Sequence, residues 1–129
     1  MTQKITIEVI NHKSQRYETC GDWQFKDDNN LLIRVSNLND TKMNCLVAIH
    51  ELVEALLCKF NDPEITTAQV DSFDMKFEKN RKEEDNSEPG DCPEAPYYEQ
   101  HKLATVIERA LASALKVDWE DYEKRIDSL

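Results

Sequence analysis

The first 36 residues alternate between apolar and polar side chains, which is the pattern of half-buried β-strands. The sequence Asp28-Asn29-Asn30 separates two of the alternating runs, and Asn and Asp are typical turn residues, so these two runs are expected to form a hairpin. We therefore expect residues 1–36 to form an antiparallel β-meander of about three strands. The alternating apolar positions are Ile5, Ile7, Val9, Trp23, Phe25, Leu31, Ile33 and Val35.

From residue 40 the apolar positions recur every three or four residues, which predicts amphipathic helices. The first helix is expected over about residues 41–60. A second is expected to begin behind Thr66 or Thr67 and to run to about Glu83, so that 40–83 form a helical hairpin packed face to face. The positions expected to face the core are Leu46, Ile49, Val53, Leu56, Leu57, Phe60, Val70, Phe73 and Phe77.

The rest of the chain predicts an acidic loop followed by helices. Residues 84–96 are rich in acids and proline and indicate an exposed loop. Residues 97–129 are expected to hold one helix to about Lys116 and a short final helix capped by Asp118. The longer helix is expected to bury Leu103, Ile107, Ala110, Leu111 and Ala114. The whole, residues 1–129, is then a single α+β domain.

Composition narrows the possible functions. A chain of 129 residues and 15.0 kDa fits one domain. Its formal net charge of −10 argues against nucleic-acid binding, which needs a basic face. The longest apolar run, Cys45 to Ile49, is too short for a membrane span, and the N-terminus does not resemble a signal peptide. Four cysteines without C-x-x-C spacing indicate reduced thiols, so we expect a cytoplasmic protein.

The segment His50-Glu51-Leu52-Val53-Glu54 is the clearest chemical motif. Side chains four residues apart on a helix lie on one face, about 6 Å apart. In H-E-x-x-H zinc enzymes two histidines at this spacing bind the metal, and the glutamate between them is the general base. Glu54 replaces the second histidine, and a carboxylate is also a zinc ligand. We therefore expect a divalent metal, zinc first, with manganese, iron or magnesium as alternatives.

Further candidate ligands lie on the other helices. His101 and Glu108 are two turns apart on one helix edge, beside small alanines. Asp74 lies on the corresponding edge of the second helix. We expect His50, Glu54 and His101 to bind the metal and Glu51 to act as the catalytic base. Asp74 or Glu108 is then a fourth ligand or the acceptor that orients an imidazole. The alternative without a metal is a buried histidine–carboxylate network that holds the helices in register.

Several short segments resemble a family of small uncharacterised proteins of phages and prophages. The resemblance covers most of residues 40–120 and, through the H-E-x-x helix, extends to minimal zincin-like metallohydrolases. It implies a zincin-like helix core, a metal-binding site at the residues named above and a location in the cytoplasm of a phage's host cell. The segments are His50-Glu-Leu-Val-Glu-Ala55, Asp71-Ser-Phe-Asp74, Glu88-Pro-Gly-Asp91, Ala95-Pro-Tyr97 and His101-x-x-Ala104-x-x-x-Glu108.

Two other functions compete with a hydrolase of unknown substrate. Glu51-x-x-Glu54 and Asp71-x-x-Asp74 resemble the carboxylate pairs of MazG-type NTP pyrophosphatases, which implies a magnesium site for nucleotide phosphates. That family is all-helical, and His50 and His101 would then have no role. The other alternative is a non-enzymatic acidic phage accessory protein that binds a host protein, with a structural metal or none.

Overall fold

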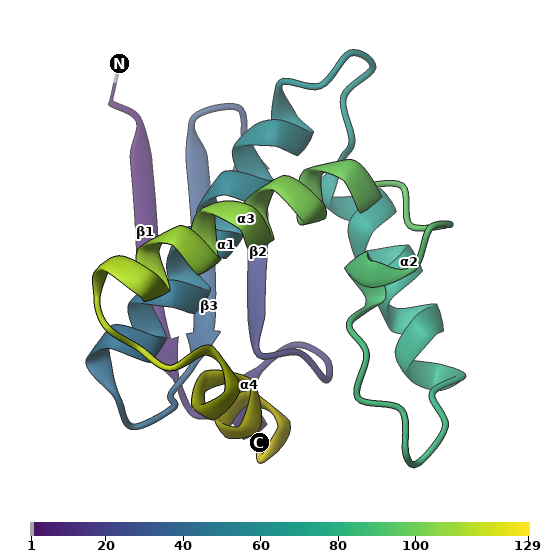
Figure 1. The fold of residues 1–129 in the computed structure, drawn as a ribbon. Helices are drawn as coiled ribbons and strands as arrows, with labels where there is room; N and C mark the ends of the chain where they lie inside the picture. The colour runs from purple at the N-terminus through teal and green to yellow at the C-terminus, as the bar shows by residue number, and fades with distance from the viewer. Residues whose placement is uncertain (1) are drawn as a thin grey trace.

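The structure, a computed structural model, describes residues 2–129 and has the expected α+β architecture (Figure 1). Three strands form one mixed sheet in the order β1-β3-β2. They are β1 (Lys4–Ile10), β2 (Gly21–Asp27) and β3 (Asn30–Ser36). Four α-helices follow, with two short 3-10 turns in the connections.

The hairpin of β2 and β3 is confirmed. The two strands pair antiparallel, with Trp23 opposite Ile33. In the turn, the Asp27 carboxylate accepts a hydrogen bond from the Asn29 backbone N–H (2.8 Å), which is the local side-chain contact that favours Asp and Asn in turns.

The expected antiparallel meander is wrong at β1, which pairs parallel with β3, with Ile7 opposite Ile33. Residues 11–20, which include the 3-10 turn η1 (His12–Ser14), carry the chain past β3, so β2 adds to the far side of that strand. Alternation along a strand reports which face is apolar, but it does not report which strand lies alongside. At the sheet edge the apolar residues of β1 are about half exposed: Ile5, Ile7 and Val9.

Three of the four described helices begin directly after a residue whose side chain caps the first turn. The four helices are α1 (Thr41–Lys59), α2 (Thr67–Lys79), α3 (Tyr98–Ala114) and α4 (Trp119–Asp127). The N-caps are Asp40, Thr66 and Asp118 for α1, α2 and α4, and each side chain accepts a hydrogen bond from a backbone N–H in the first turn. Within residues 2–129, none of the helices has the length and apolar character needed to cross a membrane.

The second helix is shorter than expected. It ends at Lys79 instead of about Glu83, because Arg81 folds back to form a salt bridge with Glu78. The same guanidinium donates to the backbone carbonyls of Asp85 and Ser87, so the chain turns into the acidic loop at this point.

The helical hairpin expected over 40–83 differs from the observed packing. Helix α1 covers β2 and β3, and α3 packs across α1, whereas α2 lies apart from α1 and contacts β2 and the 3-10 turn η2 (Pro89–Asp91) (Figure 1). Two contacts direct the chain there. The Ile65 backbone N–H donates to the Cys58 carbonyl (3.0 Å), and Thr67 accepts a hydrogen bond from the Phe25 backbone N–H (3.2 Å).

The buried helix faces are more polar than the apolar periodicity predicted. Helix α3 exposes Leu103 and Ile107, which were expected in the core. It buries the opposite face, where Ala104 and Ala112 are small enough for α3 to lie close to α1. On α1, Leu56 and Phe60 are also exposed, because this helix turns a different face toward β2, β3 and α3. The buried charged or imidazole side chains of the two helices are His50, Glu51, Glu54, His101 and Glu108.

Candidate metal centre

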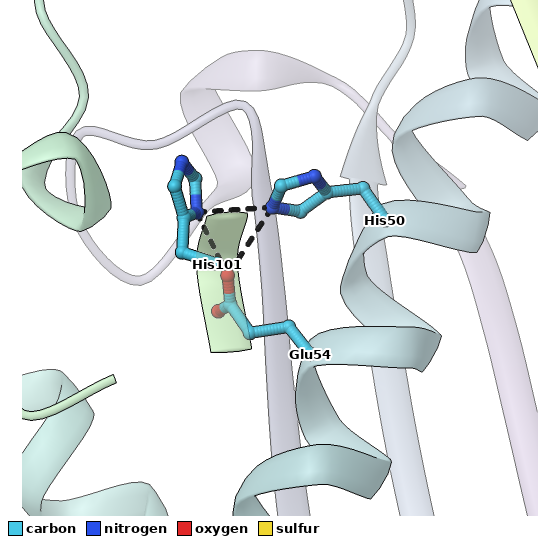
Figure 2. A group of neighbouring side chains, drawn as sticks. All are labelled: His50, Glu54 and His101. Carbon is cyan, nitrogen blue, oxygen red and sulfur yellow. Dashed lines mark hydrogen bonds and ion pairs between the residues drawn. The ribbon is translucent and has the colours of Figure 1, made fainter. Parts of the chain in front are cut away.

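Helices α1 and α3 bring together the three residues expected to bind a metal. Figure 2 shows His50 and Glu54 on one helix and His101 reaching toward them from α3. His50 Nε2 lies 3.1 Å from His101 Nδ1 and 3.2 Å from Glu54 Oε2, and His101 Nδ1 lies 2.9 Å from the same oxygen. All three side chains are buried. Their ligand atoms thus form a compact triangle that could hold a metal ion.

With Glu54 ionised, protons alone leave one side of this triangle unsatisfied. If both nitrogens carry hydrogens toward the centre, the contact between His50 and His101 joins two donors. If only one nitrogen does, the other places its lone pair against the Glu54 oxygen. A cation at the centre accepts all three lone pairs at once. Ligands at about 2.1 Å from a tetrahedral zinc are roughly 3.4 Å apart, close to the observed sides. The residues present therefore fit a metal.

Further contacts hold the ligands in the orientation that metal binding needs. Glu108 Oε1 lies 2.8 Å from His50 Nδ1, and its other oxygen accepts a hydrogen bond from the Tyr122 hydroxyl. A carboxylate there favours the tautomer with hydrogen on Nδ1, which leaves the His50 Nε2 lone pair facing the triangle. The Trp23 indole N–H donates to Glu54 Oε1 (3.0 Å), so Oε2 stays toward the imidazoles. Glu108 was expected to be either a fourth ligand or the acceptor that orients an imidazole. In the structure it lies in the second position, against Nδ1 of His50.

Charge stabilises this cluster in the absence of a metal. Burial would raise the pKa of Glu54, but hydrogen bonds with His101 and His50 lower that pKa to about 2. Burial likewise lowers the pKa of each imidazole, yet the surrounding carboxylates outweigh it and raise the pKa of both His50 and His101. Protons and a metal therefore compete for the same nitrogens.

Both glycines of the chain pack against residues of the site. A Cβ added to Gly90, in η2, would lie 2.4 Å from Cγ of His101. A Cβ on Gly21, at the start of β2, would lie 2.9 Å from Cγ of Glu51. Neither glycine has a positive φ, so close approach to a neighbour, not backbone conformation, is what requires glycine here.

Replacing Gly90 by alanine should weaken zinc binding by about 10-fold or more, because the His101 ring must leave the position in which its Nδ1 contacts Glu54. Isothermal titration with zinc measures the change. Asn86→Ala, an exposed change in the same loop, is the control and should bind zinc as the wild type does. Equal zinc affinity of Gly90→Ala and the wild type would show that the position of the His101 ring does not affect zinc binding.

Glu51, the expected catalytic base, lies beside the triangle. Its Oε2 is 3.9 Å from His50 Nε2, outside hydrogen-bond distance. Burial, followed by the negative charge of Glu54, raises its pKa well above the usual range for a glutamate. It lines a cavity of about 270 Å³, together with the three residues of the triangle. Glu51 is therefore a basic carboxylate placed next to the metal-binding atoms.

Asp74 lines the same cavity but does not join the triangle. Its two oxygens accept hydrogen bonds from the hydroxyls of Tyr97 and Tyr17, the latter at 3.0 Å. Burial raises the pKa of Asp74 to about 7, although the hydrogen bond from Tyr97 opposes the shift. Asp74 on α2 thus contacts one tyrosine from residues 11–20 and one from residues 92–97, and it lies away from the three ligand atoms.

The raised pKa of Asp74 predicts a pH-dependent stability. Because the folded state holds this proton more tightly than the unfolded state, the stabilisation is full below pH 3.8 and is lost as pH rises through about 7. Between pH 5 and 8 we expect the free energy of unfolding of the wild type to fall by roughly 2 to 3 kcal/mol more than that of Asp74→Asn. Urea denaturation across this range tests it, with the exposed Glu123→Gln as control. Parallel pH profiles of wild type and Asp74→Asn would contradict it.

The two carboxylate pairs of the nucleotide hypothesis do not meet in one site. Asp71 forms a salt bridge with Arg16 through both oxygens and lines a separate hollow. The cavity beside Glu51 is strongly acidic, and among the described residues that line it the one Lys or Arg is Arg81, whose guanidinium binds Glu78. A triphosphate would meet repulsion there.

Glu88 and Asp91 lie in the acidic loop, and the sequence singled them out only as the ends of a segment of the resemblance, not as candidate ligands. Their carboxylates approach the other ring nitrogen of His101, and this trio is a second group that could hold a metal. A possible signal was Gly90 between them, since glycine is rare in this chain. Trp23 and Tyr122 are buried in the core, and their polar atoms also hydrogen-bond residues of the site. Comparisons of this chain with protein-family models, curated proteins and solved structures find no match.

Proposed function

We propose that this protein is a metal-dependent hydrolase that binds a divalent cation, zinc first, through His50, Glu54 and His101. The observation that carries the proposal is the triangle of buried ligand atoms, whose spacing fits a divalent cation and which protons leave unsatisfied while Glu54 is ionised. Two imidazoles and one carboxylate form a known ligand set of hydrolytic zinc sites, which keep a fourth position open for water.

The residues around the triangle suit hydrolysis. A bound cation would supply Lewis-acid chemistry, activating water and polarising a carbonyl group. Glu51 would take the proton of the attacking water and later deliver it to the leaving group. Its raised pKa makes it a stronger base than an ordinary glutamate, and a nearby cation would lower that pKa. Glu108 and Trp23 would keep His50 and Glu54 in place through the cycle.

The charge of the cavity limits the substrate. Acidic side chains at its mouth, including Glu18, Glu83 and Asp85, disfavour phosphorylated or carboxylated ligands. We therefore propose a neutral or cationic amide or ester as the substrate. The resemblance to phage and prophage proteins supports a role inside a bacterial host cell.

Removing the metal and restoring it tests this function. Protein treated with a chelator should lose hydrolysis of a panel of fluorogenic peptides and aryl esters, and added zinc should restore it. Circular dichroism after chelation checks that the fold survives. Zinc bound at the triangle with no hydrolysis of either substrate type would instead support a structural metal in an accessory protein.

A further inference from the structure

The second group at His101 has a feature that an exposed acidic cluster lacks. Glu88 Oε2 and Asp91 Oδ1 lie 3.1 and 3.2 Å from His101 Nε2. His101 is 4 % exposed, and its Nε2 is buried with no hydrogen-bond partner, since neither oxygen lies along the N–H direction. A buried, unpaired ring nitrogen is costly. It therefore points to a ligand that contacts all three atoms.

A cation satisfies these atoms better than a proton does. The hydrogen on Nε2 points in a single direction and forms a well-aligned hydrogen bond with neither carboxylate. A metal ion accepts lone pairs from several directions. The distances from Nε2 to the two oxygens are close to the roughly 3.4 Å between ligands of a tetrahedral zinc. One imidazole and two carboxylates bind zinc, manganese or iron. The carboxyl groups of Glu88 and Asp91 are about half exposed, so a cation can enter from solvent.

We propose that Glu88, Asp91 and Nε2 of His101 form a second divalent-cation site, and that the His101 ring bridges it to the first site. The two ring nitrogens point to opposite sides, Nδ1 to Glu54 and Nε2 to the loop. The second cation replaces the hydrogen on Nε2, which leaves to solvent through one of the exposed carboxylates. An imidazole bridge keeps the cations farther apart than the roughly 4 Å of centres that share a water. The second cation therefore acts by fixing η2 against α3.

Zinc stoichiometry tests the second site. Metal-free protein is dialysed against zinc and analysed for metal, with circular dichroism to check folding. We expect two equivalents for the wild type, one for the double variant E88Q/D91N and none for His101→Gln. The double variant should fold normally because both side chains are exposed. E83Q/E84Q removes the same charge from exposed positions of the same loop and should still bind two equivalents.

The outcomes separate this site from the proposed function. One equivalent in both the wild type and E88Q/D91N would overturn the second site and leave the first intact. A wild type that binds one equivalent, which E88Q/D91N loses and His50→Gln keeps, would support the second site. The same result would show that the triangle binds no metal, which contradicts the proposed function. Nitrogen shifts of the His101 ring give an independent readout, because zinc at both sites should shift both ring nitrogens and zinc at the first site only Nδ1. Absence of zinc binding in the wild type would overturn both sites.

Discussion

Replacing His50 or His101 by glutamine should remove the metal that we propose for the triangle. Each imidazole supplies one corner of the triangle, and the two remaining ligands cannot hold a divalent cation tightly. We expect zinc affinity to fall by more than the roughly 10- to 100-fold that loss of an outer partner costs. Elemental analysis of protein purified without added metal measures the loss and identifies the metal.

The third histidine of the chain is a matched control for this experiment. His12 contacts Ser36 and Glu18 at the end of β1 and lies outside the triangle. His12→Gln should therefore keep the full metal content. Glutamine is used in place of alanine because it can still contact Glu108 and so limits the cost of leaving that carboxylate buried without a partner. Equal metal content in all three variants would refute the triangle as a metal site.

Glu51→Gln should abolish hydrolysis and leave metal binding intact. The amide has nearly the same shape as the carboxylate but cannot accept a proton from water, so kcat/KM should fall by on the order of 10² to 10⁴. Metal content should not change, since Glu51 is not a corner of the triangle. The melting temperature should hold or rise, because glutamine resembles the protonated carboxyl that burial favours at this position.

A second glutamate of the cavity provides the comparison for Glu51. Glu83 lines the mouth and is exposed, so Glu83→Gln should keep nearly full activity. Hydrolysis by Glu51→Gln at the wild-type rate would remove Glu51 from the chemistry. Loss of metal together with loss of activity would instead assign it a structural role.

Local interactions explain why much of this protein can be predicted from its sequence. The caps at Asp40, Thr66 and Asp118 depend on residues within one helical turn, and all three helices begin where these caps predict. The hairpin turn at Asp28 is local in the same sense. The pair His50 and Glu54 shares a helix face through the helix repeat alone. These features need no knowledge of the rest of the fold.

Long-range contacts decided the features that the sequence could not predict. Alternation in β1 showed a strand but not that it pairs parallel with β3, because a strand pattern is the same for either partner. Apolar periodicity also indicated the wrong inward face of α3. The polar face is buried because Glu108 and His101 find partners on α1 and α4, which only the packing of three helices supplies.

The sequence by itself determined the elements, the α+β class and the candidate ligands His50, Glu54 and His101. The tertiary structure decided which carboxylates meet them. Glu108 approaches His50, Asp74 joins two tyrosines instead, and Glu88 and Asp91 come from an acidic loop in which the sequence named no ligand. The physical reason is that a helix repeat fixes neighbours a turn or two apart, whereas contacts across tens of residues depend on how whole elements pack.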